Sequence, residues 1–358
     1  MTYVIAAAGT GGHVNPALAV ADALTERGVD RGNILFIGGE RFEAEAVPRA
    51  GYRFAGFELT RLRRSLSPDN LKIPAVLRRT SATMAHEIRR FGGKVVLGMS
   101  GYVTVPAAMA ARRAGLPFVL QEQNAHPGIA ARFAARRAVK TFLGLPGKAE
   151  VLPRSQLVGN PLRSQIAGFD RRALREAARR NYGLEVSGPV LGVLGGSQGA
   201  RVLNEAVDRI AQSAGGIGSI IHLTGRAAFE QTEPRAAGSS LPWICLPYEP
   251  RMELFYAAAD LILCRAGAMT VSELAATSSP SVLVPLARVG QAFNAQALSS
   301  VGGAEVVIEG NIGSLPAKIT ALVANDRGLA AMSRAAGSTA LPNAASIIAD
   351  HLIEVANA

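Results

Sequence analysis

Two glycine-rich turns, each directly after a short apolar run, could hold the phosphates of a ligand. Residues 9–13 (GTGGH) follow the apolar run 4–8, and residues 195–199 (GGSQG) follow the apolar run 190–194. Glycine lets backbone N–H groups approach an anion, and the positive end of a following helix favours negative charge. Val14 replaces the third glycine of a dinucleotide fingerprint, and the chain has no P-loop motif. The second turn is the stronger phosphate candidate, although a tight turn with a serine N-cap would look the same.

A third segment, residues 264–273 (CRAGAMTVSE), repeats this pattern and adds an acid. It follows the apolar run 261–263, turns at Gly267, and places Glu273 one turn into the expected helix. A carboxylate accepts more than one hydrogen bond, so Glu273 could take both hydroxyls of a ribose. The same residues could also serve only to cap the N-terminus of the helix. One turn suited to phosphate and one suited to ribose predict a nucleotide-diphosphate donor.

Metal chemistry has little support in the sequence. No Asp-x-Asp pair occurs, and the nearest pattern, Glu43-Ala44-Glu45, has a helical setting that favours a solvated face. Helix dipoles and Arg163 would then have to stabilise the negative charge of the leaving group. Cys245 and Cys264 have no Cys or His at metal-ligand spacing and stand in apolar runs. We therefore expect buried strand cysteines, no metal and no cofactor, in a reduced cytosolic protein.

The elements that would position these residues alternate along the chain. At about 150 residues per domain, 358 residues suggest two domains. Helix-like stretches such as 16–27 and 200–212 separate short apolar runs at 3–8, 33–37, 94–97, 118–120, 141–143, 190–194, 219–223, 243–246, 261–263, 281–284 and 305–307. Such alternation predicts parallel sheets with both faces covered, in an α/β fold of two doubly wound, Rossmann-like domains.

The boundary between the domains is expected near residues 158–161, where Gly, Asn and Pro interrupt the pattern. We assign residues 1–160 to the first domain and residues 161–340 to the second. The last segment, 343–355, has helical periodicity, so a C-terminal helix at about 341–358 is expected to pack back onto the first domain. The N-terminus lacks a basic signal region, and no apolar stretch reaches the roughly 18 residues of a membrane span.

The net charge of +11 is confined to the N-terminal half. Residues 1–162 carry 22 Lys or Arg and 11 Asp or Glu, whereas the remainder carries 16 of each. A basic half indicates an anionic partner, either nucleic acid or an anionic membrane surface. The plainer alternative is a solvated, arginine-rich surface.

A series of short motifs also occurs in one order over residues 3–308. They are GTGGH at 9–13 with Pro16-Ala17, GYV at 101–103, EQN at 122–124, GNPLR at 159–163, GGSQGA at 195–200, RAGAMTVSE at 265–273, and Gln291 with Asn294-Ala295. Each is weak alone, but together they resemble the MurG family of peptidoglycan N-acetylglucosaminyltransferases.

The resemblance implies a GT-B fold whose two domains face each other across a cleft. It implies inverting transfer of N-acetylglucosamine from UDP-GlcNAc to the C4 hydroxyl of the muramoyl sugar of lipid I, giving lipid II, without a metal. By the family pattern, the substrate-binding residues would be Thr10, Gly11, Gly12, Asn124, Arg163, Gly196, Ser197, Gln198, Glu249, Ala268, Met269, Thr270, Val271, Ser272, Glu273 and Gln291. Ser197 and the 195–196 turn would meet the diphosphate, Glu273 the ribose, Gln291 the sugar, and backbone near Tyr248-Glu249 the uracil.

An inverting transfer needs one base for the acceptor proton. His13 is the leading catalytic candidate because it lies on the acceptor-side turn and an imidazole titrates near neutral pH. It could instead only hydrogen-bond the loop or the acceptor. Glu122 is the second candidate. His126 could touch the acceptor, while His86, His222 and His351 carry no partner signature and are expected to be structural or exposed.

The sequence departs from the family pattern at residues 285–291 (PLARVGQ). This loop is shorter than in relatives, and Gly290 replaces a polar side chain. The departure keeps open the alternative of a related transferase with another lipid or small-molecule acceptor. A UDP-sugar epimerase of the same fold, which would need no membrane-binding patch, is a further alternative. A non-catalytic sugar-nucleotide-binding relative is more remote.

The basic residues of the first half gather in residues 61–94, interleaved with apolar ones. The cations are Arg61, Arg63, Arg64, Lys72, Arg78, Arg79, Arg89, Arg90 and Lys94. Basic and exposed apolar side chains together are typical of a surface that binds anionic lipid. No nucleic-acid module is recognisable and aromatic interleaving is poor, so we expect no nucleic-acid partner. A lipid-linked acceptor would place the enzyme on the cytoplasmic face of the plasma membrane as a peripheral protein.

Overall fold

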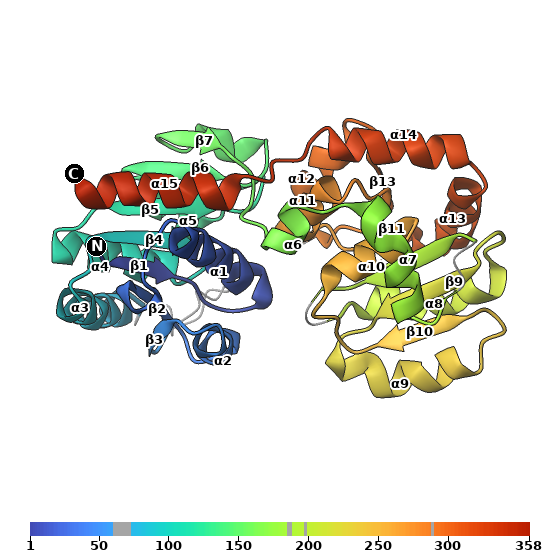
Figure 1. Ribbon diagram of the computed structural model, residues 1–358, viewed down its shortest axis with the longest axis horizontal. Coiled ribbons are helices and arrows are strands. Elements are labelled where there is room, and N and C mark those ends of the chain that lie inside the picture. Colours follow the sequence, from blue (N-terminus) through green and yellow to red (C-terminus); the bar gives the residue numbers. More distant parts are fainter. Residues whose placement is uncertain (60–72, 185–187, 197–198, 288–289) are drawn as a thin grey trace. The chain divides into compact units, whose positions relative to one another are not determined.

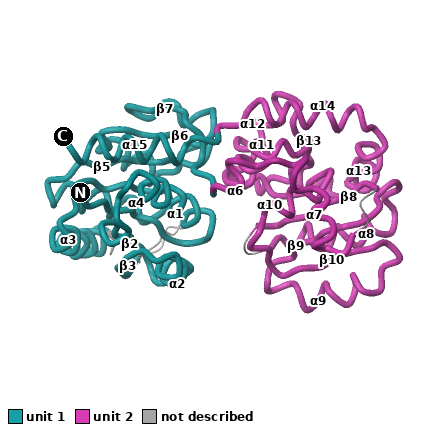
Figure 2. The backbone as a smooth tube through the Cα atoms, viewed as in Figure 1, with its two compact units in different colours: residues 1–163, 342–358 teal, residues 164–341 magenta. Residues whose placement is uncertain are grey.

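The structure is a computed structural model that describes residues 1–59, 73–184, 188–196, 199–287 and 290–358. The chain divides into two units (Figure 2). Unit 1 comprises Met1–Arg163 and Pro342–Ala358, and unit 2 comprises Ser164–Leu341.

Unit 1 is built on a parallel sheet with the strand order β3-β2-β1-β4-β5-β6-β7. The strands are β1 (Tyr3–Ala6), β2 (Ile34–Gly38), β3 (Arg53–Gly56), β4 (Val95–Met99), β5 (Phe118–Glu122), β6 (Lys140–Leu143) and β7 (Ser155–Leu157). Alternate residues of β1 serve opposite faces: Tyr3 and Ile5 join one core cluster, and Val4 and Ala6 join the other. A strand buried on both faces explains why this run is apolar throughout.

Helices cover both faces of this sheet (Figure 1). They are α1 (Gly11–Glu26), α2 (Phe42–Arg49), α3 (Ile73–Phe91), α4 (Thr104–Ala114), α5 (Ile129–Ala135) and α15 (Ala344–Asn357), with short 3₁₀ turns at Arg31–Asn33 and Lys148–Val151. The helices α3, α4 and α5 contribute to one core cluster, and α1, α2 and α15 contribute to the other.

The C-terminal helix α15 belongs to unit 1 although it follows the whole of unit 2 in sequence. It packs against α1, and its buried residues Ile348 and Leu352 lie one helical turn apart on the face that meets the core. Arg27 at the end of α1 adds an ion pair to Asp350 of α15.

Unit 2 repeats the plan with a parallel sheet of order β10-β9-β8-β11-β12-β13. The strands are β8 (Val190–Leu194), β9 (Ser219–Leu223), β10 (Trp243–Leu246), β11 (Leu261–Cys264), β12 (Ser281–Leu283) and β13 (Ala304–Val306). The helices are α6 (Ser164–Ala167), α7 (Arg171–Asn181), α8 (Arg201–Ser213), α9 (Arg226–Ala237), α10 (Met252–Ala258), α11 (Ala268–Ala276), α12 (Gln291–Ser299), α13 (Leu315–Val323) and α14 (Asp326–Gly337), with a 3₁₀ segment at Glu309–Ser314. Two doubly wound parallel-sheet units therefore confirm the predicted fold class.

The differences from the sequence prediction lie at sheet edges and helix starts. Strands β3 and β7 were not predicted, because each is a short edge strand without a continuous apolar run. Helix α1 begins at Gly11, inside the glycine turn, rather than at Pro16. Cys264 is buried as expected, but Cys245 is only half-buried because β10 is an edge strand. Among the described residues, no helix is long and apolar enough to cross a membrane.

Candidate active site

In unit 1 the first glycine turn lies where the strand order reverses. Strands β1 and β4 are neighbours at the centre of the sheet, with Ala6 paired to Gly98, so the loops that follow them leave the same edge. Open α/β sheets bind ligands in the crevice at this position. The turn requires glycine there, because Gly9 has a φ of 118°.

His13 lies at this edge of the sheet, on the first turn of α1. A Cβ built on Gly101, in the loop after β4, would lie 3.5 Å from the His13 Nε2 atom, so the imidazole ring rests directly on that loop. Thr10 is the N-cap of α1 and supplies no side-chain capping bond. The predicted residues Thr10, Gly11 and Gly12 therefore surround His13 at a helix N-terminus, and all are at least partly exposed.

A buried carboxylate that the sequence analysis assigned to a solvated face holds this turn in place. Glu43 of α2 is 0% exposed, and its Oε2 accepts the Gly9 N–H at 3.0 Å. Its Oε1 accepts the Gly39 N–H at 2.9 Å, so one side chain joins the loops after β1 and β2. The expectation of a solvated face is wrong for Glu43 and right for Glu45, which is exposed. The physical reason is that the first turn of α2 points one of its two acids at unpaired N–H groups.

A second buried carboxylate joins the loops after β4 and β5. Glu122 ends β5 and is 1% exposed. Its Oε1 accepts the Asn124 backbone N–H at 2.8 Å and the Asn124 side-chain amide at 3.1 Å, and its Oε2 accepts the Ser100 hydroxyl at 3.2 Å. Burial raises the pKa of the Glu122 carboxyl, and these hydrogen bonds oppose that rise. Gln123 then donates to the Gly12 carbonyl at 3.0 Å, which ties the loop after β5 to α1.

In unit 2 the turn at residues 195–199 and the turn at Gly267 both begin where the strand order of the sheet reverses. Strands β8 and β11 are central neighbours, with Leu194 paired to Cys264, so the turn after each strand begins beside the other. A Cβ on Gly195 would lie 2.2 Å from the Ala200 nitrogen, so only glycine fits this turn. Gly196, with a φ of 83°, precedes Ser197 and Gln198, which lie outside the described residues.

The second of these turns leads into α11, where Gly267 is the N-cap and no side chain caps the helix. Of the predicted residues in this helix, Met269, Thr270 and Ser272 are partly exposed, while Ala268 and Val271 are buried. Glu273 is partly exposed and accepts the Tyr256 hydroxyl at 2.8 Å. The structure thus brings the phosphate-type turn and the ribose-type acid to one edge of one sheet.

Three further predicted residues lie on other segments of the chain. Glu249, after β10, is 5% exposed and accepts the Tyr182 hydroxyl at 2.7 Å and the Arg251 N–H at 2.8 Å, so its carboxylate is used within unit 2. Gln291 begins α12, and its side-chain oxygen accepts the Leu286 N–H at 2.9 Å. Arg163 is the last residue of the first segment of unit 1 and is partly exposed.

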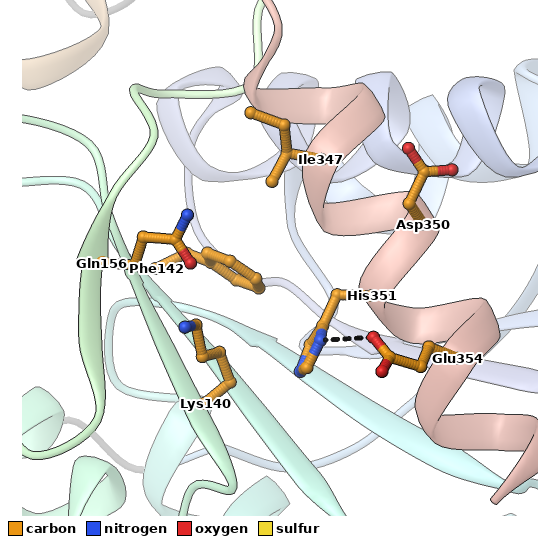
Figure 3. Close-up of a pocket in the computed structure, with 7 residues that line it drawn as sticks. All are labelled: Lys140, Phe142, Gln156, Ile347, Asp350, His351 and Glu354. Carbon is orange, nitrogen blue, oxygen red and sulfur yellow. Dashed lines mark ion pairs between the residues drawn. The ribbon is translucent and has the colours of Figure 1, made fainter.

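No group of three or more Cys, His, Asp or Glu side chains in the described part of the chain could hold a metal ion. A cavity of about 310 Å³ in unit 1 is lined by none of the predicted site residues (Figure 3). It is lined by Lys140, Phe142, Gln156, Ile347, Asp350, His351 and Glu354. The rings of Phe142 and His351 lie nearly perpendicular to each other there.

Sequence reasoning missed Glu43, Gln123 and Tyr256. Glu43 carried one usable signal, its place in the first turn of a helix after a glycine-containing loop. Gln123 stands within a motif, but nothing in the sequence indicates that it reaches Gly12, 111 positions away. Tyr256 lies in an apolar run and carries no signal at all.

The two units correspond to two matched family models. Residues 3–143 match the glycosyltransferase family 28 N-terminal domain, and residues 190–348 match the family 28 C-terminal domain. A protein of Acidothermus cellulolyticus is 40% identical over 85% of this chain and 83% of its own length, and one of Rhodococcus opacus is 36% identical over 99% and 96%. The chain belongs to glycosyltransferase family 28.

Both family 28 relatives are named UDP-N-acetylglucosamine–N-acetylmuramyl-(pentapeptide) pyrophosphoryl-undecaprenol N-acetylglucosamine transferase. The crystal structure of Acinetobacter baumannii MurG is similar with a TM-score of 0.77 and 26% identity, covering 99% of this chain and 100% of that chain. The predicted resemblance to the MurG family is therefore confirmed. A Staphylococcus aureus MnaA–UDP structure has a TM-score of 0.73 at 12% identity, over 100% of this chain and 97% of that one, and shows the shared fold alone.

Proposed function

We propose that this protein transfers N-acetylglucosamine from UDP-GlcNAc to the C4 hydroxyl of the muramoyl sugar of lipid I, forming lipid II. The observation that carries the proposal is similarity to named transferases that runs through both units, at 36% identity over 99% of the chain. It includes the donor-type turns of unit 2 as well as the histidine-bearing turn of unit 1.

The donor is proposed to bind to unit 2. The N–H groups of the Gly195–Gly196 turn and the N-terminus of α8 would receive the diphosphate, since both present positive partial charge to an anion. Glu273 would accept the ribose hydroxyls, and backbone near Glu249 would receive the uracil. Gln291 would contact the sugar, and Arg163, which directly precedes unit 2 in the sequence, would contact the diphosphate.

The acceptor is proposed to bind to unit 1, with His13 as the base. In a single displacement, the acceptor C4 oxygen forms a bond to the anomeric carbon as the bond to the UDP oxygen breaks, and the hydroxyl proton passes to the imidazole. The anomeric centre inverts, and UDP carries away the electron pair. Preorganised N–H donors would stabilise the charge that develops on the diphosphate.

Glu122, the second candidate for the base, is better suited to holding the loops. Both of its carboxylate oxygens already accept hydrogen bonds, and it is 1% exposed. We assign it, with Glu43, to keeping Asn124 and the turn around His13 in place.

We also propose that residues 61–94 bind an anionic membrane surface, on the cytoplasmic face of the plasma membrane. In the described part of this segment, α3 buries Met84, Ala85 and Ile88 against unit 1 and exposes Arg78, Arg79, Arg89 and Arg90. Arg61, Arg63, Arg64 and Lys72, with their apolar neighbours, lie outside the described residues. A row of exposed arginines on one helix face supports the electrostatic part of the proposal.

The decisive experiment is transfer of radiolabel from UDP-GlcNAc to lipid I in detergent, with EDTA present. Labelled lipid II is the expected product and would also show that no dissociable metal is required. UDP release without labelled lipid would indicate another acceptor. Formation of an epimeric UDP-sugar without UDP release would replace the transferase proposal with an epimerase.

A further inference from the structure

The donor-side carboxylate Glu273 is held by a residue to which no role has been assigned so far. Tyr256 lies on α10 and is 0% exposed, and its hydroxyl donates to the Glu273 Oε2 atom at 2.8 Å. Glu273 lies on the next helix, α11, and the strand β11 connects the two. Water cannot replace the partner of a hydroxyl that is buried in this way, so breaking this hydrogen bond would cost free energy. The contact therefore constrains both side chains.

A single guanidinium fixes the helices that carry this pair. Arg171, the first residue of α7, donates to the carbonyls of Tyr256 and Ala259 at 2.5 and 2.7 Å. It also donates to the Thr277 carbonyl at 3.1 Å and to the Ser279 hydroxyl at 2.7 Å. Arg171 thus joins the end of α10 to the end of α11, which sets the separation between Tyr256 and Glu273.

A neutral thiol neighbours the Glu273 carboxylate. Cys264, at the end of β11, is fully buried, and its thiol pKa is raised by burial first and by the negative charge of Glu273 second. The thiol therefore stays neutral and is at most a weak donor toward Glu273. A carboxylate offers about four lone-pair positions, so one bond from Tyr256 is compatible with two more from a ligand.

We propose that Tyr256 is a positioning residue, whose hydroxyl orients the Glu273 carboxylate toward the two ribose hydroxyls of the nucleotide donor. The inference rests on the proposed function, because it takes the nucleotide as the ligand of Glu273. Because the Glu273 carboxylate is already oriented before the nucleotide binds, less side-chain entropy is lost on binding. Tyr256 itself is buried and does not touch the nucleotide.

The test is a comparison of two ligands, UDP and 2′,3′-dideoxyuridine diphosphate, by isothermal titration calorimetry on the full chain. Tyr256→Phe keeps the buried ring and removes only the hydroxyl. We expect it to weaken UDP binding about tenfold and to leave binding of the dideoxy nucleotide unchanged. The double variant Y256F/E273A should bind UDP no more weakly than E273A alone, because the tyrosine acts only through the carboxylate.

Tyr52→Phe is the matched control, since it removes a hydroxyl that donates to Asp22 at 2.6 Å in unit 1. It should bind both nucleotides as the wild type does, and thermal melts will show that each variant is folded. Y256F that binds UDP as tightly as the wild type, or that weakens both nucleotides equally, overturns the positioning role. E273A that still prefers UDP over the dideoxy nucleotide as strongly as the wild type does overturns the ribose assignment as well, so the two failures are distinguishable.

Discussion

Unit 1 and unit 2 share one architecture but stabilise the loops of their candidate sites in different ways. Each has a central pair of parallel strands, β1 with β4 and β8 with β11, and a glycine turn that leads into a helix. In unit 1, the buried carboxylates Glu43 and Glu122 join the loops directly. In unit 2, the guanidinium of Arg171 joins helix ends behind the loops.

The difference follows from what each loop would have to hold. A turn that positions a base for proton transfer needs a fixed backbone around one side chain, and internal acceptors for its own N–H groups provide that. A turn that binds phosphate needs its N–H groups for the ligand, so its support must come from elsewhere. With the proposed roles, the same fold would support two chemistries through the placement of a few buried polar groups.

The largest expected effect tests whether unit 1 carries the base. His13→Ala should lower kcat by about 10²- to 10⁴-fold, because the acceptor proton loses its base. The Kd for UDP-GlcNAc should stay unchanged, since the donor is assigned to unit 2. Stopped-flow or radiolabel kinetics and calorimetry measure the two quantities. His351→Ala, in the cavity of unit 1, is the control, and full turnover in H13A would remove His13 from the mechanism.

Replacing Glu43, the buried carboxylate of α2, tests whether unit 1 depends on the carboxylates that accept its loop N–H groups. Glu43→Ala leaves the N–H groups of Gly9 and Gly39 without an acceptor, at a cost of about 1–3 kcal/mol for each. We expect a lower urea midpoint, faster hydrogen exchange in β1 and β2, and reduced turnover, with unchanged affinity for UDP. Glu45→Ala, two residues away, removes only an exposed pair with Arg49 and should change stability by less than about 0.5 kcal/mol. Equal behaviour of the two variants would mean that Glu43 supports nothing.

The units should respond to pH in opposite directions. Burial lowers the pKa of His222 in unit 2 to about 3, below its ordinary 6.5, so stability present above pH 6.5 is lost toward pH 3. Burial raises the pKa of Glu122 in unit 1 above its ordinary 4.5, so stability present below pH 4.5 is lost as pH rises. Each group contributes a slope of up to about 1.4 kcal/mol per pH unit.

Urea unfolding at several pH values measures this contrast. The single tryptophan, Trp243, stacks on His222 and reports on unit 2, while hydrogen exchange in β5 reports on unit 1. His222→Gln should remove the acid-side loss in unit 2, and Glu122→Gln should remove the alkaline-side loss in unit 1. Parallel pH profiles for each variant and the wild type would contradict the assignment.

The smallest expected effect tests the charge difference between the units. Replacing Arg78 and Arg79 of α3 by alanine should weaken sedimentation with phosphatidylglycerol vesicles, since each basic residue contributes about 1 kcal/mol near anionic lipid. Replacing Arg172 and Arg180, which are exposed on α7 of unit 2, should have no effect. Binding should also fall as salt is added. Equal losses from both pairs would mean that attraction is not confined to unit 1.

The sequence predicted the fold class because each central strand is apolar on both faces, a local property that does not depend on neighbours. It missed β3 and β7, which are edge strands whose residues are partly exposed. It also identified the glycine turns, because the requirement for glycine there is local. Gly9 has a positive φ, and a side chain at Gly195 would collide with the backbone of Ala200, five residues later.

What the sequence determined by itself, then, is the alternation of strands and helices, the turns between them, and the acid in the first turns of α11. What only the tertiary structure decided is which polar groups meet. Glu43 reaches Gly9 across 34 positions, and Arg171 reaches Thr277 across 106. The reason is physical: parallel strands that are neighbours in a sheet are distant in sequence, so loops that share an edge are brought together only by the strand order.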